Sequence, residues 1–132
     1  MIRSLGMIKK ACAMANHECG HLDDERTGYI IAACDEIIQG KLDCWFITDV
    51  IQGGAGTSTN MNANEVVANR AAQLAGKALG VYDYIHPNDH VNFGQSTNDV
   101  FPTAGKLTAL FLVEDLLEEL MLLQEALLDK KY

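Results

Sequence analysis

Apolar residues recur at helical spacing along much of this chain and predict a mainly α-helical fold. The first helix carries its apolar residues three or four positions apart, at Leu5, Ile8, Cys12, Ala15 and Cys19. Lys9 and Lys10 fall on another face of this helix. Gly20 follows the last apolar position, and glycine commonly ends a helix, so we expect the helix to stop there.

Two further helices are expected between Asp23 and Ala75. The second begins near Asp23 or Asp24, because acidic residues favour a helix N-terminus, and it ends around Gly40. Residues 41–52 form a short segment with aromatic and β-branched residues, so an extended connector and a helix are equally expected there. Apolar and alanine spacing predicts the third helix over Asn64–Ala75.

A loop and one long helix complete the predicted organisation. Residues 81–94 are predicted to form a loop, because His86 precedes a proline and that position disfavours helical geometry. The last helix begins between Ser96 and Thr103 and continues to the C-terminus. Pro102 is placed in its first turn, where the missing amide hydrogen is tolerated.

The last helix is unusually apolar. One seam steps by threes and fours through Leu107, Leu110, Val113, Leu117, Leu120, Leu123 and Leu127. Further leucines widen the apolar surface, and Glu114, Asp115, Glu118 and Glu119 leave only a narrow polar face. Such a helix needs neighbours on several sides. We expect it to join a bundle formed with missing sequence, with other subunits, or with both.

Composition narrows the class of protein. With 132 residues the chain fits one domain or a piece of something larger, and 48% apolar residues is normal for a globular protein. The formal net charge of −8 argues against nucleic acid or an anionic membrane surface as partner. We find neither a signal peptide nor an apolar run of the ~20 residues that a membrane span requires.

Four cysteines, Cys12, Cys19, Cys34 and Cys44, form no CxxC pair. We interpret them as reduced and mostly buried thiols of a cytoplasmic protein.

Two clusters of small polar residues stand at helix starts. In the first, glycines precede Thr57, Ser58 and Thr59, which gives close backbone approach, free amides and hydroxyl donors. The second is the stretch "QSTND", with Ser96, Thr97 and Asn98. Helix capping explains one such cluster, but two in one short chain favour a shared anion pocket.

The loop between the clusters contains His86, Asn88, Asp89 and His90. It is interpreted as a turn whose Asn and Asp bond their own backbone. As a metal site the group is too compact and lacks supporting ligands, so no metal is predicted.

The two polar clusters belong to longer, unusual sequence motifs. The stretches "GGAGTSTNMNANEVVANRA" and "HPNDHVNFGQSTNDVFPTA" resemble the fumarase/aspartase superfamily, and most closely its aspartate ammonia-lyase branch. The match runs nearly without interruption from Gly53 to Ala104, and the upstream "AACDEIIQGKLD" is also similar to that family.

The resemblance implies a fold and an assembly. Family members are mainly helical homotetramers whose core is a bundle of long helices from all four subunits. They are several times longer than this chain, so the resemblance implies a fragment of a full enzyme. Residues 1–100 would then belong to the N-terminal lyase domain, and residues 101–132 would begin the central bundle.

The resemblance also implies an activity without a cofactor: reversible elimination of ammonia from L-aspartate to give fumarate. Its substrate-binding residues would be Thr57, Ser58, Ser96, Thr97 and Asn98, with Asn98 helping to hold the amino group. The general base, a serine on a glycine-rich loop, would lie beyond residue 132, so no catalytic base or acid is expected here. We therefore expect the isolated chain to be inactive.

A second anion site is implied at His86, Asn88 and Asp89, since the equivalent loop binds anions in fumarases. The position three before His86, often basic in that site, is Asp83 here.

Two alternatives remain open at the level of sequence. Fumarases typically have "GSGTQSNMN" and "QSSND" in these two places, whereas Ala55, Ser58 and Thr97 are the aspartase-like forms. Both enzymes bind the same dicarboxylate skeleton, so a class II fumarase is the first alternative. The second is a non-catalytic scaffold module that keeps the lyase fold.

Overall fold

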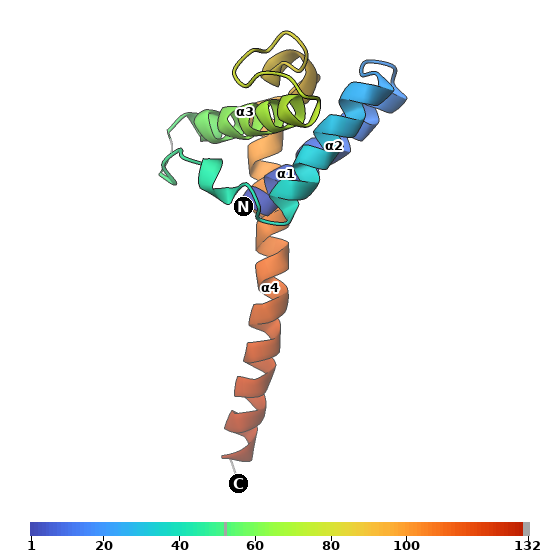
Figure 1. Cartoon of the computed structure of the whole chain (residues 1–132). Coiled ribbons are helices and arrows are strands. Elements are labelled where there is room, and N and C mark those ends of the chain that lie inside the picture. The colour runs from blue at the N-terminus through green and yellow to red at the C-terminus, as the bar shows by residue number, and fades with distance from the viewer. Residues whose placement is uncertain (52, 131–132) are drawn as a thin grey trace.

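The computed structural model describes residues 1–51 and 53–130, and within them every regular element is helical. The α-helices are α1 (Ile2–Glu18), α2 (Asp24–Ile38), α3 (Thr57–Leu74) and α4 (Thr97–Asp129), and short helical turns lie in the connections that follow α2 and α3. Figure 1 shows α1, α2 and α3 gathered into a head from which α4 projects. The mainly α fold class predicted from sequence is confirmed.

The hairpin of α1 and α2 forms one side of the head. Gly6 allows its two helices to approach closely, because a Cβ atom there would lie 2.9 Å from Cγ2 of Ile37. The second helix begins as predicted, with Asp23 as a side-chain cap that accepts a hydrogen bond from the amide of Arg26. The main apolar core lies between this hairpin, α3 and the following loop, and it includes Ile30, Cys34, Ile37, Val67, Ala71 and Ile85.

Helix α3 starts at Thr57, seven residues before the predicted Asn64. A left-handed turn precedes it, with φ values of 66°, 57° and 80° at Gly54, Ala55 and Gly56. Thr, Ser and Asn normally favour caps and loops over helix interiors, which explains the error. Here the helix is retained because Asn60 and two further asparagines in its first two turns are buried by tertiary packing.

The two connecting segments differ from simple loops. Residues 41–51 are irregular apart from one 3₁₀ turn, η1 (Asp43–Trp45), and Gln52 lies outside the described residues. The predicted loop at 81–94 contains a single π-helical turn, η3 (Pro87–Val91). His86 caps this turn through Nδ1, so an extended residue before proline is followed at once by helical geometry.

Helix α4 begins at Thr97 with Ser96 as its cap, within the predicted interval. Pro102 is its sixth residue, so the prediction of a first-turn position was wrong. The helix tolerates it in the second turn, where the proline cannot donate to the carbonyl of Asn98. The helix crosses residue 100 without a break, and the domain division predicted there stays a prediction.

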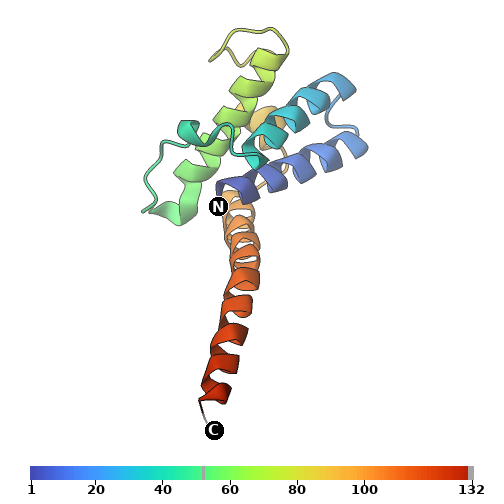
Figure 2. The same ribbon diagram turned by 60° about the horizontal axis from the view of Figure 1, so that its bottom comes forward.

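Only the start of α4 is covered by the head. Val100 and Ala104 are its buried residues, and all described residues from 109 onward are exposed. In Figure 2 this part extends away from the other helices, as it does in Figure 1. Large apolar side chains are exposed along its whole length, among them Leu110, Leu112, Leu116, Leu120, Leu123 and Leu127.

A polypeptide of residues 1–132 is therefore expected to self-associate in water, because a contiguous apolar helix surface is unfavourable when solvated. Sedimentation velocity should give a mass well above 14.4 kDa. Replacing Leu116 and Leu120 by glutamate should shift the distribution toward the monomer, whereas the surface control Glu118→Gln should not. A clean monomer of the unmodified chain would contradict this expectation.

All four cysteines are free thiols, as predicted, but they are not mostly buried. Cys34 is buried and Cys12 is partly buried, whereas Cys19 and Cys44 are exposed at or beyond helix ends. The periodicity that included Cys19 continues past the point where the first helix stops. None of the helices in the described ranges has the length and hydropathy needed to cross a membrane.

Candidate functional site

The two polar clusters predicted from sequence meet in the structure. Nδ2 of Asn60, in the first turn of α3, donates a hydrogen bond of 3.0 Å to Oγ1 of Thr97, the first residue of α4. The turn η2 (Gly54–Gly56) before α3 also packs on α4, because Gly56 lies directly against the ring of Phe101. The starts of the two helices thus share one location, joined by two residues that are 37 positions apart in sequence.

Thr97 is the predicted site residue best placed to donate a hydrogen bond outward. Its Oγ1 already accepts from Asn60, and a hydroxyl has one hydrogen to give. The side chain is half-buried, and no described residue accepts that hydrogen. The hydroxyl therefore keeps its donor for a group outside the described residues.

The neighbours of Thr97 are exposed and also carry donors. Oγ of Ser96 accepts the amide hydrogen of Asn98 at 3.2 Å, so the predicted capping role of Ser96 is present. Its hydroxyl hydrogen is not used in that bond. The side chain of Asn98 is exposed at the same helix start. Both residues lie at the N-terminus of α4, where the helix dipole favours an anion. The amides of Asn98, Asp99 and Val100 already donate to the hydroxyl or the carbonyl of Ser96.

The first cluster is arranged differently. Thr57 is exposed, and its Oγ1 donates a 2.8 Å hydrogen bond to the carbonyl of Gly54. In this arrangement its hydroxyl can accept but has no hydrogen left to donate to an anion. Ser58 is exposed one residue further on. The assignment of Thr57 and Ser58 as substrate-binding residues stays a prediction, and for Thr57 it requires the hydroxyl to turn away from Gly54.

A buried lysine lies behind these residues. Lys9 is completely buried, so its assignment from sequence to a separate polar face of the first helix was wrong. Its Nζ donates hydrogen bonds of 2.9 Å to Oδ1 of Asn92 and to Oε1 of Gln95. Asn92 also accepts from Nδ2 of Asn60 at 3.2 Å, which connects the lysine to the site.

Sequence reasoning missed Lys9, Asn60, Asn92 and Gln95 as site residues. One signal was available for the lysine. Lys9 stands four residues from Leu5 and four from Ala13, and all three are buried on one stripe of α1. The two loop residues, Asn92 and Gln95, had no comparable signal, because only the tertiary fold brings them to the lysine.

Burial lowers the pKa of Lys9 from 10.5 to about 8, since the charged form loses its hydration. Two neighbouring thiols respond in the opposite direction. Burial raises the pKa of Cys34 to about 12, and it also raises the pKa of Cys12. These are the titratable groups that face Lys9, since its partners Asn92 and Gln95 are neutral amides.

This arrangement predicts how stability changes with pH. Above pH 8 the folded state releases the Lys9 proton while the unfolded chain keeps it up to about pH 10.5, so Lys9 makes stability rise with pH. The thiols oppose this above about pH 9, where only the unfolded chain loses their protons. Between pH 8 and 9 the protein should gain about 1 kcal/mol in unfolding free energy relative to Lys9→Met. Urea unfolding of both proteins at pH 8 and pH 9 measures this gain. The same change in unfolding free energy between the two pH values for both proteins would contradict it.

The loop at His86 is internally bonded. Nδ1 of His86 accepts from the amides of Asn88 and Asp89 at 3.2 Å each, which places its ring hydrogen on Nε2. His86 in turn donates its own amide hydrogen to Nδ1 of His90. Burial, followed by the charge of Arg26, lowers the pKa of His90. The secondary anion site at His86, Asn88 and Asp89 stays a prediction, with Nε2 of His86 as its available ring donor.

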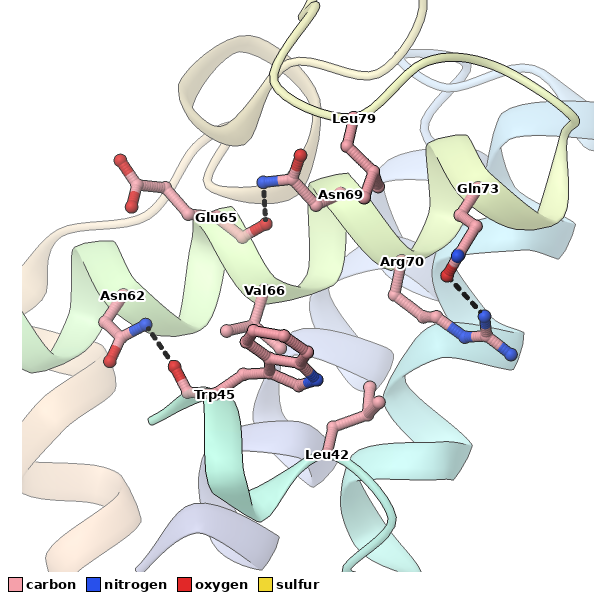
Figure 3. Close-up of a pocket in the computed structure, with 9 residues that line it drawn as sticks. All are labelled: Leu42, Trp45, Asn62, Glu65, Val66, Asn69, Arg70, Gln73 and Leu79. Atoms are coloured by element: carbon pink, nitrogen blue, oxygen red, sulfur yellow. Dashed lines mark hydrogen bonds between the residues drawn. The ribbon is translucent and has the colours of Figure 1, made fainter. Parts of the chain in front are cut away.

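A cavity in the described part of the chain lies elsewhere. It is a groove of about 420 Å³ against α3, lined by Leu42, Trp45, Asn62, Glu65, Val66, Asn69, Arg70, Gln73 and Leu79 (Figure 3). Two of its polar side chains are already engaged: Asn62 donates to the carbonyl of Trp45, and Arg70 pairs with Glu36 at 2.6 Å. None of the predicted site residues lines it, so it is not the candidate site.

Among the residues that the structure describes, no three His, Cys, Asp or Glu side chains gather as a metal site would require. What the described residues offer at the candidate site is a set of neutral hydrogen-bond donors at the N-terminus of α4, with the carboxylate of Asp99 in the same turn. Such a set binds a carboxylate or another small anion without giving up a proton at neutral pH.

Comparison with known proteins gives the family. The sequence model of the family described as lyase matches residues 1–132. This chain belongs to the lyase family. The resemblance seen in the two polar motifs is thereby confirmed for the whole chain, α1 and α2 included.

The relatives of this lyase chain include two kinds of enzyme. It is 53% identical over 130 residues to an aspartate ammonia-lyase of Bacillus sp and 54% identical over 130 residues to a class II fumarate hydratase of Halobacterium salinarum. Each match covers 98% of this chain but only 28% and 27% of the relative. The chain thus spans little more than a quarter of the length of these relatives.

Solved structures show the same fold in a lyase. A crystal structure of fumarate lyase:delta crystallin from Brucella melitensis superposes with a TM-score of 0.82 at 55% identity. It covers 83% of this chain and 26% of the other. A class II fumarase from Schistosoma mansoni gives a TM-score of 0.76 at 43% identity over 80% of the chain and 22% of that protein.

Proposed function

We propose that this chain supplies part of the dicarboxylate pocket of an enzyme that reversibly eliminates ammonia from L-aspartate to give fumarate. In this proposal Ser96 and Thr97 bind a substrate carboxylate, Asn98 holds the amino group, and Thr57 and Ser58 approach from the start of α3. The complete enzyme is proposed to be a cytoplasmic homotetramer without a cofactor, whose central bundle contains the exposed part of α4.

One observation carries the proposal. The hydrogen bond from Asn60 to Thr97 joins the two polar helix starts and leaves the Thr97 hydroxyl free to donate. The exposed hydroxyl of Ser96 belongs to the neighbouring residue and also has a hydrogen to donate. In this proposal the two hydroxyls at the N-terminus of α4 bind one small anion together.

The chemistry requires such donors. A proton must leave the carbon next to a carboxylate, and negative charge then accumulates on that carboxylate before ammonia departs. Hydrogen bonds that are oriented in advance toward the growing charge stabilise the transition state more than the ground state. Neutral hydroxyl and amide groups suit this role because they stay in one protonation state near neutral pH.

The base that removes the proton is not assigned to this chain. None of the five residues assigned to the site is a carboxylate or a histidine, and the proposal gives no role to Asp99, the carboxylate in the first turn of α4. The resemblance to the superfamily implies a base serine outside residues 1–132. The proposal therefore concerns the binding part of the active site, and residues 1–132 alone are expected to show no turnover.

The test uses the complete protein that contains this chain. Ultraviolet absorbance should report fumarate formation from L-aspartate, and the reverse reaction should consume fumarate only when ammonia is present. The isolated polypeptide of residues 1–132 serves as the inactive control. Absence of fumarate from aspartate under conditions where malate is converted would reject the aspartase assignment.

A class II fumarase is the second candidate function. A specific observation supports it: the identity to the Halobacterium fumarate hydratase, 54%, is as high as that to the Bacillus aspartate ammonia-lyase, 53%. Ala55, Ser58 and Thr97 favour aspartase, because they carry the forms typical of that branch. The same assay with L-malate distinguishes the two, and failure with both substrates would leave the non-catalytic scaffold module as the better description.

A further inference from the structure

The buried lysine of α1 has no role in the proposed chemistry, yet the fold keeps it inside the protein. Lys9 is 0% exposed, and none of the described carboxylates forms an ion pair with it. Burying an unpaired cation is costly unless its hydrogens are well bonded. Its described partners are instead the side-chain oxygens of two neutral amides, Asn92 and Gln95.

A lysine in this position fixes the orientation of both amides. An ammonium group can only donate, so the atoms that face Lys9 must be oxygens. Their NH2 groups then point toward backbone carbonyls: Asn92 Nδ2 donates to the carbonyl of Gln95, and Gln95 Nε2 donates to the carbonyl of Val91. Each amide is thus held between a group that only donates and a group that only accepts.

The fixed orientation continues to the candidate site. Because the Asn92 atom nearest Asn60 is an oxygen, Asn60 must present its NH2 group to it, at 3.2 Å. The second hydrogen of that same NH2 group is donated to Oγ1 of Thr97, at 3.0 Å. Thr97 must therefore accept at Oγ1, and its own hydrogen is left to donate elsewhere.

We infer that Lys9 is a positioning residue that sets the direction of the hydrogen bonds through Asn92 and Asn60, so that the Thr97 hydroxyl donates toward the site. The inference rests on the proposed function, because it gives the Thr97 hydrogen a substrate carboxylate as acceptor. It assigns to α1 a part in an active site whose binding residues lie on α3 and α4.

Without the ammonium group, a competing arrangement becomes available. Asn92 can turn its amide and present NH2 toward Asn60, which would then turn as well. In that state Oδ1 of Asn60 accepts from the Thr97 hydroxyl, and the donor is lost to the substrate. Oδ1 of Asn60 is buried and has no hydrogen-bond partner among the described residues, so turning the amide of Asn60 breaks no such bond of this oxygen.

The test compares variants of the complete protein. Lys9→Met removes the donors but keeps the length of the side chain, and Lys9→Arg keeps a group that can only donate. Lys10→Met is the matched control, because Lys10 bonds Asp35 at 2.7 Å on a partly exposed face of the same helix. We expect Lys9→Met to lower kcat at least tenfold with little change in KM, Lys9→Arg to recover part of that loss, and Lys10→Met to stay within twofold. Circular dichroism and sedimentation verify that each variant is folded and assembled.

A second comparison tests whether Lys9 acts through the direction of the hydrogen bonds at Thr97 or through general stability. In a Thr97→Val background the hydroxyl is absent, so adding Lys9→Met should cause no further loss of kcat. Losses that multiply would show that Lys9 acts by another route and would overturn the inference. If the wild type is active and Lys9→Met has the same kcat as Lys10→Met, the inference is also overturned. The carbonyls of Gln95 and Val91 would then be sufficient to orient the amides of Asn92 and Gln95. A complete protein that acts on neither aspartate nor malate would instead reject the proposed function and this inference together.

Discussion

Replacing Gly56 by alanine is expected to lower the unfolding free energy by about 3 kcal/mol, the largest stability loss we predict for a single added methyl group. Two costs combine. Gly56 has φ of 80°, where an L-residue with a side chain is strained. Its added Cβ would also lie 2.4 Å from Cγ and Cδ2 of the Phe101 ring, so the ring and the start of α4 must move. Urea unfolding at fixed protein concentration measures the loss.

Two other glycines in the same loop separate these costs. Gly54 has φ of 66° but nothing within 4 Å of an added Cβ, so Gly54→Ala should lose only the backbone term of about 1 kcal/mol. Gly53 is extended with equally open surroundings, so Gly53→Ala should be neutral or slightly stabilising. If all three variants lose the same amount, the contact with Phe101 has no energetic role. Trimming Phe101 to leucine should recover part of the Gly56→Ala loss.

The second large effect is expected on catalysis. Thr97→Val in the complete protein keeps the β-branched shape and removes the hydroxyl, and kcat should fall by about 10²–10³-fold, as for loss of one preorganised oxyanion donor. The physical reason is that Thr97 accepts from Asn60 and so has its hydrogen free for the substrate. Stability should fall by only about 1 kcal/mol, because one hydrogen of Asn60 loses its acceptor. Initial rates with L-aspartate and urea unfolding measure the two effects.

Controls keep this test specific. Thr97→Ser retains a hydroxyl at the same position, and its kcat should stay within about tenfold of the wild type. Thr103→Val makes the same change on an exposed residue six positions further along α4 and should leave turnover unaltered. If Thr97→Val loses stability and assembly but the folded fraction turns over normally, Thr97 has a structural role and the proposed pocket is wrong.

Substitutions at Gly56 and at Thr97 act on one junction. Gly56 sets how closely η2 approaches α4, and Asn60 bonds Thr97 one turn further along α3. A displaced Phe101 therefore also changes the distance between Asn60 and Thr97. We expect Gly56→Ala to lower turnover as well as stability, whereas a loss confined to stability would mean that the two contacts are independent.

Local pattern was sufficient where an element depends on its own residues. The first two helices were predicted close to their observed limits, because apolar spacing and acidic caps act within one or two turns. The start of α4 at Thr97, with Ser96 as its cap, lies within the predicted interval from Ser96 to Thr103. The polar motifs at Thr57–Thr59 and Ser96–Asn98 favoured an anion pocket, because two such helix starts exceed what capping requires, and their assignment to substrate binding stays a prediction.

Pattern failed where burial decided the outcome. The start of α3 was placed seven residues late, since asparagine and threonine disfavour helix interiors until tertiary contacts bury them. Lys9 was placed on a polar face, although its spacing from Leu5 and Ala13 matched the buried stripe. The charge of Lys9 suggested an exposed position despite this spacing. In the structure, hydrogen bonds to the side-chain oxygens of Asn92 and Gln95 offset the loss of hydration of the buried ammonium group.

Short-range spacing and long unusual motifs are local properties of the chain, and they were enough to predict the helical class, the family and the residue types proposed for the site. Which donors meet, and in which direction their hydrogens point, depends on how the helices pack. Asn60 and Thr97 are 37 residues apart, and Lys9 and Asn92 are 83 apart. No local rule relates such positions, because their contact depends on how the α1–α2 hairpin, α3 and α4 pack around one core.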